Sequence, residues 1–316
     1  MDILSIINVV VYDYLWGTPM VIFILAAGLY FTVRSGFFQF RFFGHAIKYT
    51  CSRLFGRNRE DSGEGSLSPL QAVSTALGST IGTGNISGVA TAVAVGGPGS
   101  IFWMWVAGLF GMLIKMVEIT LAVYYRRRDS EGKPYGGPTY YMEEELGKKR
   151  GLKAVAWIFI ILFCLGFFIG FIINIQTYTV TEAVATTFGW GMIPVAVCYT
   201  VLLFIMINGG LKRVGEWCSY LVPVMCVAYL GGGVVIILKN IAVVPSVIAG
   251  IFANAFTPTA AVGGFAGATV SLAMTTGLAR SVYSNEAGWG TAPMIHSTAK
   301  VDHPVKQGLI GILRCS

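Results

Sequence analysis

The feature that most constrains this chain is a series of apolar segments, each near or above the length that crosses a lipid bilayer. A transmembrane helix needs about 20 apolar residues. Seven such segments, with few charged side chains, lie at residues 15–33, 68–96, 99–124, 154–187, 190–208, 217–238 and 258–284. The chain is 55% hydrophobic and 12% charged, whereas soluble domains contain about 25% charged residues. The sequence therefore predicts a multi-pass membrane protein without a soluble domain.

The segments favour helices over a transmembrane β-barrel. Barrel strands are about 10 residues long and alternate strictly between apolar and polar side chains. The segments here are longer and do not alternate. We therefore predict an all-α polytopic membrane protein.

Basic residues mark alternate connections between the segments. Nearly all of the 22 Lys and Arg residues lie in 34–67, in 125–153, at Lys212 and Arg213, or from Arg280 onward. Because Lys and Arg are enriched in cytoplasmic loops, we predict basic loops in the cytoplasm, the N-terminus outside, and a location in the cell (inner) membrane. The net charge of +7 then reflects topology, and we expect no nucleic-acid partner.

Two of the segments contain glycine runs at their midpoints. The stretch ALGSTIGTGNISGVATA (76–92) has Gly-Thr-Gly-Asn at 82–85, and the last segment has Gly-Gly-Phe-Ala-Gly at 263–267. Close helix packing accounts for glycines spaced four apart, but not for the polar side chains among them. Unwound backbone at membrane depth is tolerated where it lines a cavity or is buried in protein. Two breaks in corresponding, inverted positions therefore indicate the midplane site of a secondary transporter.

An inverted-repeat fold divides the chain into four parts. Residues 1–33 are predicted to form an interfacial helix and an extra span, and residues 34–67 a basic cytoplasmic connection with a helix at the membrane surface. Residues 68–238 would form the first five-helix repeat, and residues 239–316 an incomplete second repeat. Within the latter, 240–257 is too short to span and is predicted to be re-entrant or interfacial at the outer surface. We interpret the chain as C-terminally truncated.

The motifs resemble those of a known family. The run GSTIGTGNISGVATAVAVGGPGSIFWMW at 78–105 resembles the signature of the alanine or glycine:cation (sodium:alanine) symporters, as do stretches 15–43, 135–143 and 279–309. The family fold resembles that of the neurotransmitter:sodium symporters. The resemblance implies uptake of small neutral amino acids, alanine or glycine, by symport with sodium. It implies alternating access around two broken helices, with no enzymatic activity and no resident cofactor.

The resemblance also implies a site at the first break. The N–H groups of Thr83 and Gly84 would hold the substrate carboxylate, and the Asn85 amide oxygen would take the substrate ammonium or a cation. Carbonyl groups of Gly78 and Ile81 would contribute to a sodium site. A helix N-terminus suits an anion, and carbonyl oxygens suit a hard cation.

Three further residues are candidates for the substrate site. Gln176, in the fourth segment, either contacts substrate or makes a hydrogen bond between helices. Phe265, beside Gly264 in the second break, is the candidate apolar wall for a small side chain, or a core residue. Such a wall would favour alanine or glycine over leucine.

Other polar residues have structural interpretations beside functional ones. Lys115 and Glu118 face the same side of a helix, so they are predicted to form a structural ion pair, with gating or proton coupling as the alternative. Glu286 is predicted to act at an inner gate or to anchor a loop. His296 and His303, in a predicted loop, are not expected to bind a metal. The Gly-Gly-Pro at 136–138 predicts a turn before a short helix ended by Gly147.

Several alternatives stay open. A channel would need rings of charge that often set selectivity, and none is evident. A membrane enzyme would need a motif such as HExxH, which the chain lacks. A truncated, non-transporting fragment of a symporter is a further alternative. Sodium and protons both remain candidates for the coupling ion, and the sequence leaves the oligomeric state open.

Overall fold

The structure is a computed structural model that describes residues 18–55, 67, 69–173, 175–257 and 270–315. Almost all of these residues are helical, which confirms the predicted all-α class. One short hairpin is present, in which β1 (Arg127–Arg128) pairs antiparallel with β2 (Pro134–Tyr135). The predicted N-terminal interfacial helix and the predicted break at 263–267 lie outside the described residues.

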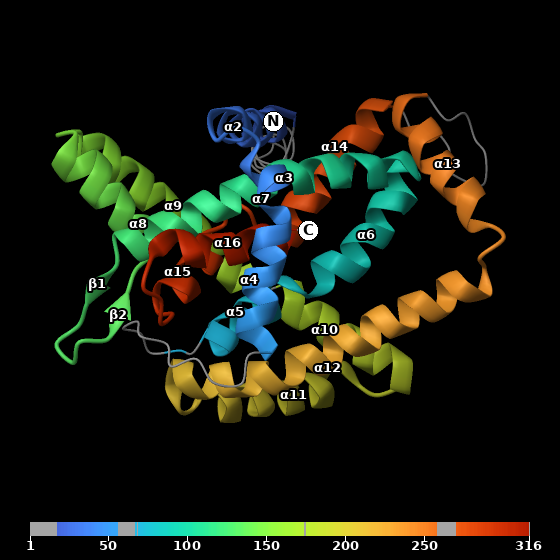
Figure 1. Ribbon diagram of the computed structural model, residues 1–316. Helices are drawn as coiled ribbons and strands as arrows, with labels where there is room; N and C mark the ends of the chain where they lie inside the picture. Colours follow the sequence, from blue (N-terminus) through green and yellow to red (C-terminus); the bar gives the residue numbers. More distant parts are fainter. Residues whose placement is uncertain (1–17, 56–66, 68, 174, 258–269, 316) are drawn as a thin grey trace, which may run out of the picture.

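Helix α7 (Gly99–Tyr124) is the centre of the bundle (Figure 1). It has the bounds predicted for the third segment. Helices α14 (Val270–Asn285) and α16 (Pro304–Cys315) make its largest contacts, and α2 (Thr18–Arg34) and α13 (Val244–Phe256) also pack on it. The central position explains why apolar, charged and small side chains are buried together along α7.

The other predicted spans appear with altered bounds. The fourth segment is helical on both sides of residue 174, which lies outside the described residues, as α9 (Lys153–Ile173) and α10 (Ile175–Phe188). Helix α11 (Met192–Ile207) agrees with the fifth segment. Helix α12 (Gly210–Lys239) starts at Gly210 rather than at residue 217, so Lys212 and Arg213 belong to its first turn. Hydropathy marks only the lipid-facing part of a helix, and a polar first turn lies beyond it.

Three described helices are long and apolar enough to cross a membrane by themselves: Gly99–Tyr124, Lys153–Gly170 and Gly210–Lys239. Four shorter apolar helices accompany them, at Pro19–Arg34, Gly84–Gly96, Met192–Ile207 and Val244–Phe256. Large apolar side chains on α9, α11 and α12, such as Phe168, Phe204 and Leu230, are exposed. Exposed apolar faces of this extent suit contact with hydrocarbon.

The basic connection after α2 contains α3 (Phe38–Arg41) and α4 (Phe43–Phe55). Ala46 of α4 is buried in a cluster with Met112 of α7 and with Leu309 and Ile312 of α16. Phe37 and Phe40 remain exposed. One side of this connection therefore packs on the bundle while aromatic side chains face outward.

Glycines allow the closest helix contacts around α7. A Cβ atom added to Gly277 would lie 2.4 Å from the backbone oxygen of Ser100, and one added to Gly99 would lie 2.2 Å from that of Asn254. Both distances are far below van der Waals contact. The approach of α14 and α13 to the start of α7 therefore requires glycine at these positions.

The second connection contains a π-helix. After the hairpin, α8 (Pro138–Tyr141) continues into the π-helix η2 (Met142–Lys149). The prediction that Gly147 ends this helix is wrong, because Gly147 is buried within η2. Gly151, with φ of +70°, follows the end instead. A glycine ends a helix when it adopts this left-handed conformation.

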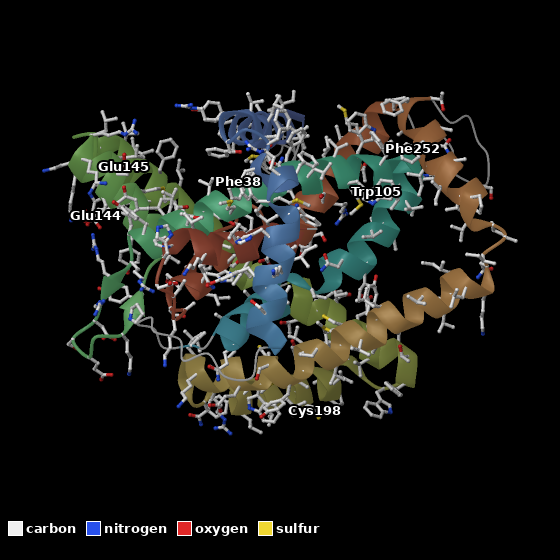
Figure 2. All side chains as sticks on the ribbon, in the orientation of Figure 1. Phe38, Trp105, Glu144, Glu145, Cys198 and Phe252 are labelled. Carbon is white, nitrogen blue, oxygen red and sulfur yellow. The ribbon has the colours of Figure 1, made fainter. Side chains whose placement is uncertain are left out.

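Charged side chains hold this connection together (Figure 2). Arg127 donates to Glu143 and to Glu144, and Glu145 accepts from the Tyr125 hydroxyl at 2.5 Å. The hydrogen bonds of Glu144 with Lys148 and Arg127 lower the pKa of its carboxyl group. Those of Glu145 with Tyr125 and Lys149 lower the pKa of that carboxyl group as well.

Two backbone hydrogen bonds connect Leu67, just before α5, to residues just after α15. The N–H of Leu67 donates to the carbonyl of Thr298 at 3.4 Å, and the N–H of Lys300 donates to the carbonyl of Leu67 at 3.1 Å. Arg126 donates to the carbonyl of Ala299 at 3.1 Å. The residues just before α5 and just after α15 are thereby held at the C-terminal end of α7.

Candidate substrate site

The first predicted break is present in the structure, slightly displaced. Helix α5 (Pro69–Thr80) ends before Ile81 and Gly82, and α6 (Thr83–Gly96) starts directly after them. The expected unwound run was 82–85, but Thr83 to Asn85 form the first turn of α6. The interruption therefore covers Ile81 and Gly82, with Gly82 in an extended conformation.

The break gives backbone groups at two helix ends. The first N–H groups of an α-helix have no acceptor within the helix, and its last carbonyl groups have no donor. Thr83 and Gly84 contribute such N–H groups at the start of α6, and Gly78 lies in the last turn of α5. These are the backbone groups to which the family resemblance assigns a carboxylate and a cation.

A second interruption lies between α14 and α15 (Thr291–Ser297). Residues 286–290 are irregular, and Glu286, Gly288 and Gly290 have positive φ angles of 53°, 82° and 89°. Glu286, which was predicted to act at an inner gate or to anchor a loop, lies in this stretch and is 8% exposed. We call residues 286–290 the inner break, because they interrupt a helical path inside the bundle.

The two interruptions lie side by side. The Ser284 hydroxyl donates to the Asn85 amide oxygen. A Cβ atom added to Gly84 would lie 3.0 Å from the Tyr283 ring, and that ring packs on Trp289 with centroids 5.3 Å apart. The polar start of α6 therefore meets the end of α14 and the inner break within the bundle.

Sequence reasoning missed Tyr283 and Ser284 as neighbours of Asn85. Their signal was the polar run YSNEAG at 283–288, which was interpreted as the end of a span. Of the other predicted site residues, Gln176 lies in the first turn of α10, and its side chain lies outside the described part of the chain. Gly264 and Phe265 lie outside the described residues altogether.

The predicted ion pair between Lys115 and Glu118 is confirmed. The ammonium nitrogen of Lys115 lies 2.9 Å from a Glu118 carboxylate oxygen, and the two residues are 0% and 6% exposed. Lys115 also donates to the backbone carbonyl of Glu286 at 2.5 Å. The other Glu118 oxygen accepts from the N–H of Gly288 at 3.1 Å. Both charges of the pair thus contact the inner break.

The prediction that His296 lies in a loop is wrong. It lies in α15, is fully buried, and its Nδ1 is 2.6 Å from the Gln307 amide nitrogen. Helix α15 is buried against α5 and α7, so polar composition alone suggested a loop where tertiary packing supports a helix. Among the described residues, no group of three His, Cys, Asp or Glu side chains is placed to hold a metal ion.

An apolar surface groove lies away from the interruptions. It has a volume of about 490 Å³ and lies between α10 and α11, where its walls are almost entirely apolar, with Trp190 and Cys198 among them. Figure 2 shows Cys198 at the edge of the molecule. A groove without polar groups offers nothing to orient a zwitterion, so the candidate site remains the junction of the two interruptions.

Comparison with known proteins decides the family. The model of the sodium:alanine symporter family matches residues 1–315. The chain belongs to the sodium:alanine symporter family. This family consists of transporters and not of enzymes.

Three relatives show the range of transporters to which this sodium:alanine symporter family member is similar. The uncharacterized transporter YflA of Bacillus subtilis is 41% identical over 95% of this chain and 62% of its own length. The sodium/alanine symporter AgcS of Methanococcus maripaludis is 39% identical over 99% of this chain and 67% of its own length. The probable sodium/glutamine symporter GlnT of Bacillus subtilis is 37% identical over 94% of this chain and 59% of its own length. The chain thus spans about two thirds or less of the length of these curated relatives.

Proposed function

We propose that this protein is a secondary active symporter that imports a small neutral amino acid, alanine or glycine, with sodium moving down its gradient. Transport proceeds by alternating access around two broken helices, one interrupted at Ile81 and Gly82 and one predicted to be interrupted at 263–267, outside the described residues. The names of AgcS and GlnT, a sodium/alanine and a probable sodium/glutamine symporter, support amino-acid symport with a cation. The fold we propose is an inverted repeat like that of the neurotransmitter:sodium symporters.

One observation carries the proposal: the two interruptions lie side by side inside the bundle. Asn85 at the start of α6 accepts from Ser284, and Gly84 packs against Tyr283. Discontinuous helices that meet near the membrane midplane form the substrate and ion sites of secondary transporters. Irregular backbone at this depth is otherwise costly.

The candidate site residues differ in the part of the substrate or the ion that they bind. The N–H groups of Thr83 and Gly84 bind the substrate carboxylate, with Asn85 and Gln176 as polar neighbours. Gly264 and Phe265 form the wall that faces the substrate side chain. The carbonyl groups of Gly78 and Ile81 bind sodium, and Asn85 is a further candidate ligand. Oxygen ligands of this kind suit a hard cation.

The orientation follows from the two ends of α7. Charged side chains, Glu144 and Glu145 among them, gather at one end, and the aromatic pair Trp105 and Phe252 lies at the other (Figure 2). Basic connections remain cytoplasmic, so the end with the β1–β2 hairpin faces the cytoplasm and α13 faces outside. The N-terminus is then outside in the cell (inner) membrane.

Reconstitution tests the function. Liposomes that contain the purified protein and an inward sodium gradient should accumulate alanine above its external concentration. Equilibration without accumulation would support a channel. No uptake in any gradient would support the alternative of a non-transporting fragment. Accumulation driven by a pH gradient without sodium would identify protons as the coupling ion.

A further inference from the structure

We infer that Lys115 and Glu118 of α7 are positioning residues that hold the inner break in the conformation that the transport site requires. The inference rests on the proposed function, because it assigns the pair a task in that site. It goes beyond an ion pair that stabilises the bundle, since it specifies which backbone groups the two charges hold.

Each charge of the pair contacts a different residue of the inner break. Lys115 donates to the carbonyl of Glu286, the first residue of the break, at 2.5 Å. Glu118 accepts from the N–H of Gly288, two residues later, at 3.1 Å. The pair itself closes at 2.9 Å. The Lys115 ammonium nitrogen and the two Glu118 carboxylate oxygens thus connect α7 to the irregular backbone at 286–288.

Hydrogen bonds among residues 285–291 also stabilise the inner break. The Thr291 hydroxyl donates to the Glu286 carboxylate at 2.7 Å, and the Asn285 side-chain oxygen accepts from the N–H of Ala287 at 2.8 Å. Asn285 and Glu286 are 7% and 8% exposed. Polar backbone groups buried at this level need partners, and α7 supplies two of them through side chains.

A pair needed for bundle stability alone would not require these contacts. Lys115 and Glu118 stand three residues apart on one helix, so they meet without any help from the inner break. Burying two charges is costly, and apolar side chains of similar volume often replace a buried ion pair without loss of stability. The distinguishing property of this pair is therefore its hold on Glu286 and Gly288.

The difference can be measured with the double variant K115M/E118M in the full chain. It leaves neither Lys115 nor Glu118 as a lone charge, so we expect insertion and melting temperature close to wild type. Amide hydrogen exchange across 286–291 should nevertheless accelerate about tenfold or more, because two backbone groups lose charged partners. The control K148M/E144M removes an exposed pair and should leave this exchange unchanged. Unchanged exchange in K115M/E118M would overturn the inference.

A second comparison isolates the contact to Gly288. Glu118→Gln and Glu118→Leu remove the same charge, but only glutamine retains an acceptor for the Gly288 N–H. Exchange at 288–291 should be faster in the leucine variant. Equal exchange in the two variants would contradict the assigned contact.

Transport kinetics provide a third readout. If the pair holds the break in a binding-competent state, its loss lowers the population of that state. The apparent KM for alanine in K115M/E118M should then rise about tenfold, in proportion to that loss, with a smaller change in Vmax. A purely structural pair would lower Vmax at constant KM. Wild-type protein that fails to transport would refute the proposed function, while the exchange measurements would still test the hold on the break.

Discussion

At the scale of single residues, the first turn of α6 combines a polar group with tight packing. Asn85 contacts Ser284, a residue 199 positions later in the chain. Gly84 is buried one residue earlier, directly beside the Tyr283 ring. The polar group and the close approach therefore depend on each other, because a larger residue at position 84 would separate Asn85 from α14.

Asn85→Ala tests the polar group. We expect uptake of alanine to fall about tenfold or more, because the variant removes a half-buried acceptor at the proposed substrate site and leaves Ser284 without it. Asn240→Ala, at the exposed end of α12, is the matched control and should transport like wild type. The measurement is initial uptake rate normalised to inserted protein. Normal uptake by Asn85→Ala would refute the site assignment.

Gly84→Ala tests the close approach. The new methyl group would lie 3.0 Å from the Tyr283 ring and 3.4 Å from the Cα atom of Ser284. Overpacking of this kind costs about 1–3 kcal/mol, so we expect a lower melting temperature and reduced uptake. Gly232→Ala in α12, with no atom within 4 Å of the new group, should retain both. A Gly84→Ala protein as stable and active as wild type would show that α6 and α14 are less closely packed.

At the scale of elements, pairs of oppositely charged side chains run along the π-helix η2. The hydrogen bond from Arg150 to Glu145 joins residues five apart, and those of Lys148 and Lys149 join residues four apart to Glu144 and Glu145. π-helical turns are rare and usually need such support. Because the carboxyl groups provide it, the element should depend on their ionisation.

Acid should loosen η2. The pKa values of Glu144 and Glu145 are lowered in the folded state, so their contribution is present above the ordinary glutamate pKa of about 4.3 and is lost as pH falls through the lowered values. Amide protection across 142–150, corrected for intrinsic exchange, should hold at pH 5 and fall below about pH 4. The variant E144Q/E145Q should lack this dependence. Protection lost already at neutral pH would contradict the assignment.

The sequence predicted some elements closely, for identifiable reasons. The bounds of α7 agree with the prediction because glycines and charged residues flank a run that is apolar except for a few residues, Lys115 and Glu118 among them. The first break was predicted from Gly82 and Asn85, since both weaken a helix locally. The start of α12 at Gly210 was missed because hydropathy is averaged over a window and does not mark helix ends.

The candidate site was only half predictable. Asn85 stands out as a lone amide in an apolar segment, so local sequence reveals it. Ser284 and the inner break do not stand out, because a polar stretch after an apolar segment is typical of a loop. Only the packing of α14 against α6 and α7 shows that this stretch lies inside the bundle.

At the scale of the whole molecule, the charged and aromatic ends of α7 support the orientation that we propose across the membrane. Labelling of introduced cysteines tests it. In a background without the native cysteines, Ser246→Cys in α13 should react with a membrane-impermeant maleimide in intact cells. Ser130→Cys in the hairpin turn should react only after permeabilisation. Both positions are exposed, so the reverse pattern would show the opposite orientation.

The join between Leu67 and Ala299 has a consequence for how such a protein can change over evolutionary time. Main-chain N–H and C=O groups make it, and every residue except proline offers both. Mutation can therefore change the side chains at 67 and 299 while the backbone contact persists, provided that the new side chains fill the buried cluster that these residues form with Ala72. Descendants of one ancestor could then share this link without sharing either amino acid.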